Sequence, residues 1–285
     1  MNDWKCYLCG HTQFFERDGK VRDDLALKIL QCTNCGLVTL SSLSHIQAGF
    51  YEESHMHGAD VVPMENWLRD TDWDDQRRLD MLKPLLTNKK ILDFGCGAGG
   101  FLNKAQYLSS SLVGIELERR VREFWANKIS IHSDLEEVGE GFDLITAFHV
   151  IEHLPDPVAI LKTLARKLSK NGRMVVEVPS SDDALLTLYT SKEFQLFTYW
   201  SQHLFLFNAQ TLKDLAERAG LRVVSVQQYQ RYPLSNHLHW LSKGKPGGHQ
   251  KWSFLDNAEL NHAYANALAA EGKCDTLIAH LEHVS

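Results

Sequence analysis

The feature that most constrains this chain is a glycine-rich turn that follows a short apolar run. Residues 90–94 read Lys-Ile-Leu-Asp-Phe, and residues 95–100 read Gly-Cys-Gly-Ala-Gly-Gly. Glycines permit positive φ angles and let a ligand approach bare backbone. The helix predicted from Phe101 also begins with unpaired N–H groups. The pattern therefore predicts a cofactor-binding turn between a strand and a helix.

The residues around this turn favour one kind of cofactor. Gly95, Gly97 and Gly100 fit the G-x-G-x-x-G pattern of dinucleotide sites, and Glu116 stands near the spacing expected for a ribose contact. Asp93, however, lies two positions before the first glycine, where a carboxylate would repel a pyrophosphate. A ligand that carries an ammonium group and no phosphate would be attracted instead. The pattern favours S-adenosylmethionine (SAM) over a dinucleotide.

From this turn onward the sequence resembles the class I SAM-dependent methyltransferases, and within them the type 11 and type 23 methyltransferase domains. The alternation of strands and helices predicts an α/β doubly wound parallel sheet. The resemblance implies seven strands in a Rossmann-like sheet, with the last strand inserted antiparallel. We predict strands at 90–94, 112–116, 129–132, 142–148, 173–178, 221–228 and 276–281. We predict helices at 67–86, 101–108, 119–127, 158–168, 211–219 and 258–271, and a loop at 242–248.

The same resemblance implies which residues hold the cofactor. Asp93 and the turn backbone at Gly95 and Gly97 would bind the methionine part of SAM. Glu116, at the end of the second strand, would accept hydrogen bonds from both ribose hydroxyls. The alternative for Glu116 is an ordinary solvated carboxylate.

A further contact is implied just past the third strand. Asp134 resembles the position that accepts from the adenine amine, and Leu135 would neighbour the ring. Asp134 could equally cap the next turn of the chain.

The segment 148–157, Phe-His-Val-Ile-Glu-His-Leu-Pro-Asp-Pro, is a second signature of the family. In the methyltransferases this segment follows the fourth strand and borders the methyl donor, so Phe148 is assigned to the cofactor side. His149 and His153 are placed to face an acceptor. Their alternative role is packing or capping.

His203 is the leading candidate for a catalytic base. A hydroxyl or carbon acceptor must lose a proton during methylation, and a base within hydrogen-bond reach assists that loss. His203 follows a long excursion from the fifth strand whose aromatic residues could shape an acceptor pocket. The alternative is a histidine that holds this segment to the core.

A narrower resemblance suggests the acceptor. Sugar C-methyltransferases also combine a cysteine-rich ribbon, a FYEES-like segment and an aromatic-x-x-His run. Their motif reads Tyr-x-Glu-His, whereas residues 200–203 here read Trp-Ser-Gln-His, so only the histidine carries over. We therefore expect O- or C-methylation of a sugar, a nucleotide-linked sugar or a polysaccharide precursor.

Two Cys-x-x-Cys pairs near the N-terminus predict a metal site. Cys6 and Cys9 form the first pair, and Cys32 and Cys35 form the second, 22 residues later. A glycine follows each pair, as suits a tight turn that directs N–H groups at sulfur. Four thiolates make a closed tetrahedral zinc site with a structural role. Two disulfides are the alternative, and a reducing compartment argues against them.

Composition bounds the remaining possibilities. The net charge of −6 and the scattered basic residues weigh against nucleic-acid binding. No apolar run approaches membrane-spanning length, and the first residues lack a secretory signal, so we expect a cytoplasmic protein. The partner is then a small-molecule acceptor, and the sequence leaves the oligomeric state open.

We expect three segments along the chain. They are a zinc-ribbon module (1–44), a linker with a lid and an amphipathic helix (45–88), and a SAM-binding domain (89–285) with an insertion at about 231–257. The aromatic run at 49–57 would either cover the pocket or pack as a linker. Two other functions stay open: a zinc-ribbon rRNA or tRNA methyltransferase, and a non-catalytic SAM-fold assembly protein.

Overall fold

The computed structural model describes residues 4–46 and 62–284 of the chain. The aromatic run at 49–57, expected to be a lid or a linker, lies outside the described residues. None of the helices in the described ranges is long and apolar enough to cross a lipid bilayer.

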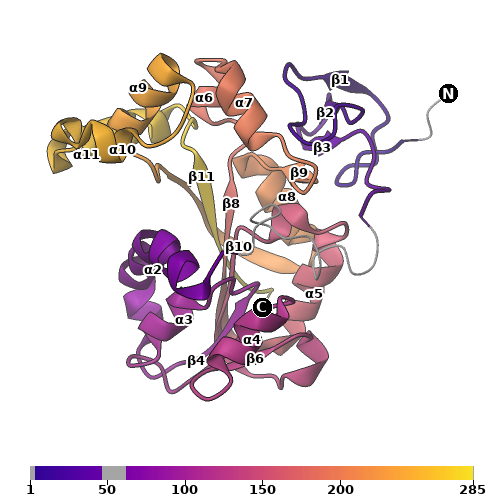
Figure 1. Ribbon diagram of the computed structural model, residues 1–285. Coiled ribbons are helices and arrows are strands. Elements are labelled where there is room, and N and C mark those ends of the chain that lie inside the picture. The colour runs from indigo at the N-terminus through magenta and orange to yellow at the C-terminus, as the bar shows by residue number, and fades with distance from the viewer. Residues whose placement is uncertain (1–3, 47–61, 285) are drawn as a thin grey trace.

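A seven-stranded sheet forms the centre of the molecule (Figure 1). Its strands are β4 (Lys90–Phe94), β5 (Ser111–Ile115), β6 (Ser130–His132), β7 (Phe142–Phe148), β8 (Leu168–Pro179), β10 (Leu221–Tyr229) and β11 (Thr276–His283). They lie in the order β10-β11-β8-β7-β4-β5-β6. The five neighbouring strands β8, β7, β4, β5 and β6 are parallel to one another, while β11 is antiparallel to both of its neighbours, β8 and β10. This confirms the predicted doubly wound sheet with an antiparallel last strand.

Helices cover both faces of the sheet. They are α2 (Met64–Leu86), α3 (Gly100–Ala105), α4 (Arg119–Trp125), α5 (Pro157–Lys167) and α8 (Ala209–Arg218). Helices α2 and α3 lie on one face and α5 and α8 on the other (Figure 1). Successive residues of a strand point to opposite faces of the sheet. Ile91 therefore packs in the cluster under α2 and α3, while the next residue, Leu92, packs in the larger core on the other face.

The N-terminal segment forms a second sheet that the main domain completes. This sheet runs β1 (Phe14–Glu16), β2 (Ile29–Cys32), β3 (Val38–Leu40) and β9 (Phe205–Leu206), all antiparallel. Strand β9 lies far along the chain, so the small sheet joins two distant segments. The ring of Phe205 lies 5.1 Å from that of Tyr7; Phe205 belongs to the larger core, and the partly buried Tyr7 packs against it. The boundaries expected for the three segments stay a prediction.

The structure holds several short helices, most of which the sequence did not reveal. After β8 they are α6 (Ala184–Thr187) and α7 (Lys192–Thr198). After β10, where an insertion was expected, they are α9 (Leu234–Lys243), α10 (Gly248–Lys251), the 3-10 turn η3 (Ser253–Leu255) and α11 (Ala258–Ala270). Two further 3-10 turns, η1 (Leu135–Glu137) and η2 (Ile151–His153), follow β6 and β7.

Only α11 of these helices was predicted, and the loop expected at 242–248 shrinks to residues 244–247. The physical reason lies in the buried face of α9, which consists largely of polar side chains such as Asn236, His237 and His239. Hydrophobic periodicity is the main sequence signal of a helix, so a polar buried face conceals one.

The joint between the two sheets can be tested by truncating Phe205, whose side chain is 1% exposed. We expect Phe205→Ala to lower the free energy of unfolding by roughly 3–5 kcal/mol, since it leaves a cavity between the sheets. Urea denaturation measures the change. Tyr107→Ala, at an 86% exposed site, is the control and should change stability by less than about 0.5 kcal/mol. Equal effects of the two substitutions would show that β9 does not join the sheets.

Candidate functional site

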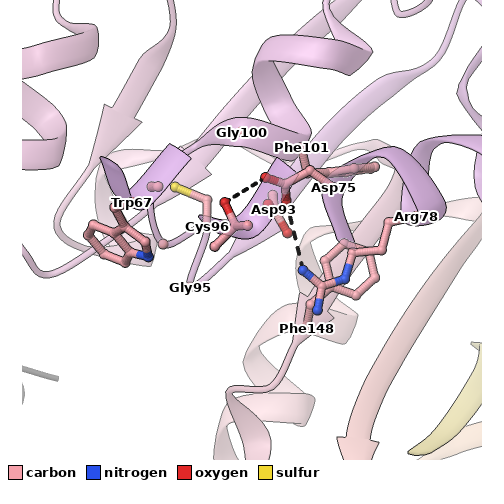
Figure 2. A pocket seen from close by; sticks show the side chains of 12 residues that line it. Trp67, Asp75, Arg78, Asp93, Gly95, Cys96, Gly100, Phe101 and Phe148 are labelled. Atoms are coloured by element: carbon pink, nitrogen blue, oxygen red, sulfur yellow. Dashed lines mark hydrogen bonds and ion pairs between the residues drawn. The ribbon is translucent and has the colours of Figure 1, made fainter. Parts of the chain in front are cut away.

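A cleft opens where β4 ends and α3 begins. Its walls come from the glycine-rich turn, from one face of α2 and from the ends of β4 and β7 (Figure 2). In an open α/β sheet, ligands bind beyond the carboxyl ends of the strands, near the point where strand order reverses. Here β4 is that point, because the chain continues to β5 on one side and later reaches β7 on the other. The cleft therefore occupies the expected binding position.

Asp93 lies at the base of the cleft and is almost completely buried, with 2% exposure. The hydroxyl of Thr146 donates to its carboxylate at 2.7 Å. Burial raises the pKa of Asp93 to about 7, and the nearby carboxylates of Asp75 and Glu116 add to the rise. The protein thus keeps a carboxyl group at the cleft that a cationic ligand would readily ionise.

The glycine turn depends on the missing side chain of Gly95 and on hydrogen bonds to the carboxylate of Glu116. Gly95 has a φ of +70°, and a Cβ atom there would meet the Val150 side chain at 2.4 Å, so only glycine fits. One oxygen of Glu116 accepts from the N–H of Gly97 at 2.9 Å, and the other accepts from the N–H of Glu118 at 3.0 Å. Burial raises the pKa of Glu116. The structure therefore brings Asp93, Gly95, Gly97 and Glu116 together.

One face of α2 completes the cleft, and the sequence analysis did not find it. Trp67, Thr71, Asp75 and Arg78 line the cavity (Figure 2). The sequence did contain an indication of this shared face, because these residues are spaced four, four and three positions apart and so lie on one side of a helix. The Thr71 hydroxyl donates to Asp75 at 2.9 Å, and burial raises the pKa of Asp75 to about 6.

Phe148 lines the cleft as expected, whereas Asp134 makes a different contact. The Phe148 ring packs edge-on against Phe101 at 5.2 Å, beneath the guanidinium group of Arg78. Asp134 accepts from the N–H of Glu136 at 2.9 Å and so caps η1. Leu135 is buried beside it. The capping alternative is thus present in the structure, and adenine recognition by Asp134 and Leu135 stays a prediction.

His149 follows β7 and is held between two buried carboxylates. Its Nε2 lies 3.1 Å from Glu177 and its Nδ1 lies 3.4 Å from Glu152. Its backbone adopts a φ of +54°, which is uncommon for a residue other than glycine. Burial alone would lower the pKa of His149, but the adjacent carboxylates of Glu152 and Glu177 raise it overall. His149 is therefore fixed in place by charge.

His153 and His203 lie side by side, with ring centroids 5.0 Å apart. The Nδ1 atom of His153 contacts the carbonyl of Gln202 at 2.8 Å, and that of His203 contacts the carbonyl of Thr198 at 2.7 Å. Burial lowers the pKa of both rings, and proximity to His153 helps to bring that of His203 to about 4. Both rings are accordingly neutral at pH 7, and His203 is a weak base.

The four cysteines meet as the sequence predicted. Sγ–Sγ distances are 3.5 Å for Cys6–Cys35 and 3.5 Å for Cys9–Cys32, and all four side chains are free thiols. A disulfide would need about 2.05 Å. Zinc–sulfur bonds of about 2.3 Å in a tetrahedron would place the sulfurs roughly 3.8 Å apart. The donor set and its spacing therefore fit a zinc ion.

The glycine after each pair adopts the conformation that such a site needs. Gly10 and Gly36 have positive φ angles, and their N–H groups donate to the carbonyls of Cys6 and Cys32 at 2.9 and 3.0 Å. These two turns bring both pairs of sulfurs to one point.

The strand order, the antiparallel last strand and the glycine turn define a class I methyltransferase fold. Residues 67–226 match the methyltransferase domain family, so this chain belongs to that family. A crystal structure of a SAM-dependent methyltransferase from Archaeoglobus fulgidus shares the fold, with a TM-score of 0.52 and 17% identity over 76% of this chain and 98% of that one.

Curated relatives match parts of the chain. The ubiquinone biosynthesis O-methyltransferase of Pseudomonas putida is 30% identical over 109 residues, which are 31% of this chain and 44% of that protein. The tRNA U34 carboxymethyltransferase of Campylobacter hominis is 28% identical over 168 residues, which are 54% of this chain and 58% of that protein. The chain thus spans about half the length of the curated relatives that it matches.

The burial of Asp93 predicts a pH-dependent effect on stability. Its folded-state pKa of about 7 lies above the ordinary 3.8, so its contribution to stability is complete below about pH 4 and is lost as the pH rises through 7. Asp93→Asn replaces the carboxyl group by a neutral amide and so removes this loss of stability at high pH. We expect the variant's gain in unfolding free energy over the wild type to be roughly 2–3 kcal/mol larger at pH 8 than at pH 5.

Urea denaturation at the two pH values measures this difference. Asp70→Asn, at an exposed position of α2, is the control and should show no such pH dependence. A gain that is the same at both pH values would mean that Asp93 stays ionised in the folded protein.

Proposed function

We propose that this protein is a SAM-dependent methyltransferase that acts on a small-molecule acceptor. The observation that carries the proposal is the cradle formed by Asp93, the glycine turn and Glu116 at the carboxyl ends of β4 and β5. Membership of the methyltransferase domain family supports it.

The charge of the cradle supports SAM over a dinucleotide. Asp75 and Asp93 line the cleft, and Glu116 is bonded to its glycine turn. SAM carries an ammonium and a sulfonium group and no phosphate, so these carboxylates would attract it. A pyrophosphate in the same place would meet repulsion from all three. We assign Glu116 to the ribose hydroxyls and Phe148 to the apolar wall of the cofactor site.

Methyl transfer is an in-line displacement, so the protein's main task is to position the donor and the acceptor. His149 and His153 follow Phe148 on the segment that would face an acceptor, and the His203 ring lies beside that of His153. We assign His203 to contact the acceptor, as its candidate base. Its low pKa suits a neutral hydrogen-bonding or ligating role better than strong proton abstraction.

For the acceptor we propose a sugar, a nucleotide-linked sugar or a polysaccharide precursor, methylated on oxygen or carbon. The aromatic-x-x-His run that ends at His203 supports this choice. One of the curated relatives named above is an O-methyltransferase of a small molecule, which supports transfer to oxygen.

A second candidate acceptor is tRNA, because another relative is a tRNA U34 carboxymethyltransferase. The net charge of −6 weighs against RNA, but the relatives do not support excluding it. Incubation with labelled SAM and either bulk tRNA or a panel of nucleotide sugars separates the two candidates.

The cofactor assignment predicts a selective calorimetric titration. We expect SAM to bind with micromolar affinity and NADH to give no signal. Asp93→Ala should weaken SAM binding at least tenfold, since it removes the carboxylate that would meet the ligand's ammonium group, and a tenfold change corresponds to about 1.4 kcal/mol. Asp70→Ala is the matched control on the exposed side of α2 and should leave the affinity unchanged. NADH binding, or a SAM affinity that is unaltered in Asp93→Ala, would contradict the assignment.

For the N-terminal module we propose a structural zinc ion held by Cys6, Cys9, Cys32 and Cys35. A closed set of four thiolates leaves no open coordination position for substrate. Because such small modules take much of their folding free energy from the metal, the ion would stabilise the small sheet that includes β9.

Elemental analysis tests the zinc proposal. We expect at least one zinc ion per chain to persist through dialysis, and Cys32→Ser to lose it because three thiolates bind more weakly than four. Cys274→Ser, at a buried cysteine away from this module, should keep the ion. Dialysed protein without zinc and with six free thiols per chain would disprove the site.

A further inference from the structure

Glu152 is a buried carboxylate that the proposed function does not use. It is 0% exposed, and neither of its oxygens has a hydrogen-bond partner among residues 4–46 and 62–284. The closest basic groups are Nδ1 of His149 at 3.4 Å and Nε2 of His153 at 3.9 Å. Burying a carboxylate without hydrogen bonds is costly, so such a group is normally paired or coordinates a metal.

His153 and His203 face the same point as Glu152. The atoms of these three side chains that could ligate an ion all lie within 4.8 Å of one another. Each ring directs Nδ1 to a backbone carbonyl, that of Gln202 for His153 and that of Thr198 for His203. A proton on Nδ1 places the lone pair on Nε2. Histidines that bind metals characteristically have this arrangement, because the backbone contact fixes the tautomer and the orientation of the ring.

The backbone around the cluster is fixed independently of the side chains. The N–H of Leu204 donates to the carbonyl of Glu152 at 2.9 Å, which joins η2 to the segment that carries His203. The N–H of His203 donates to the carbonyl of Trp200 at 2.9 Å, and β9 begins two residues later. Ligands on a rigid frame lose little freedom on binding, as a metal site requires.

We propose that Glu152, His153 and His203 form a divalent-metal site beside the cofactor turn. Two imidazoles and one carboxylate suit Mn²⁺, Fe²⁺, Co²⁺ or Zn²⁺, with open positions for water or substrate. Val150, between this site and Phe148, packs against Gly95, so the ion would lie on the acceptor side of the turn. This site is separate from the four-cysteine cluster, which is the other group of potential ligands in the described residues.

The use of the ion rests on the proposed function. A bound divalent ion lowers the pKa of a coordinated hydroxyl group and orients it. The acceptor oxygen would then bond to the methyl carbon as the methyl–sulfur bond of SAM breaks. S-adenosylhomocysteine would leave, and the hydroxyl proton would pass to solvent without a strong protein base. His203 would act as a metal ligand.

Manganese binding tests the site without SAM or an acceptor. The probe is Mn²⁺ added to protein that has been dialysed until it holds a single zinc ion per chain, with free Mn²⁺ measured by electron paramagnetic resonance. We expect one Mn²⁺ bound per chain with micromolar affinity. Glu152→Gln and His203→Ala should each weaken binding at least tenfold, while His262→Ala, at an exposed position of α11, should leave it unchanged. Circular dichroism checks that each variant is folded.

Two results would overturn the metal site: no Mn²⁺ bound by the wild type, or equal binding by the wild type and both folded cluster variants. The outcome is independent of the cofactor assignment. SAM binding without Mn²⁺ binding would remove only the metal site. Mn²⁺ binding without SAM binding would keep the metal site and remove the proposed cofactor.

Discussion

The buried carboxylate of Glu177 on β8 is the contact on which the site depends. Arg77 and Arg78 of α2 each donate to it at 2.8 Å, and Nε2 of His149 lies 3.1 Å from it. One fully buried charge thus joins α2, the centre of the sheet and the segment after β7. Removing one partner of such a buried set commonly costs 3–5 kcal/mol, because the others stay buried without compensation. These contacts hold α2 and His149 against the same strand.

The N-terminal module supports the acceptor side of the site as well as folding beside it. Asp23 accepts from the N–H and the hydroxyl of Ser201 at 2.9 and 2.7 Å, and Arg22 packs over the Trp200 ring at 4.5 Å. Together with the β3–β9 pairing, these contacts hold the segment from Trp200 to Leu206 on both sides of His203. A zinc ion in the module would therefore act on the site through the backbone, at a distance from any reacting atom.

The cleft keeps acidic groups where burial makes them costly. The pKa values of Asp75, Asp93 and Glu116 are all raised, chiefly by burial. Such groups weaken the folded protein, and a cationic ligand that enters among them recovers the lost free energy on binding. Sites of this kind commonly trade stability for function. Glu152 differs from these groups, because burial raises its pKa but His149, His153 and His203 lower it overall.

The sequence alone determined the class of fold, the glycine turn and the cysteine cluster, because each depends on local chemistry at fixed spacing. Short apolar runs indicate the buried strands, a positive φ angle requires glycine at Gly95, and paired thiols with two residues between them form a metal-binding turn. Only the tertiary structure decided which distant residues meet. It brought the face of α2 to the cleft, β9 to the N-terminal sheet, and His203 to Glu152 and His153. Those contacts join residues from about 15 to about 170 positions apart, and they depend on how the elements pack, which no local pattern records.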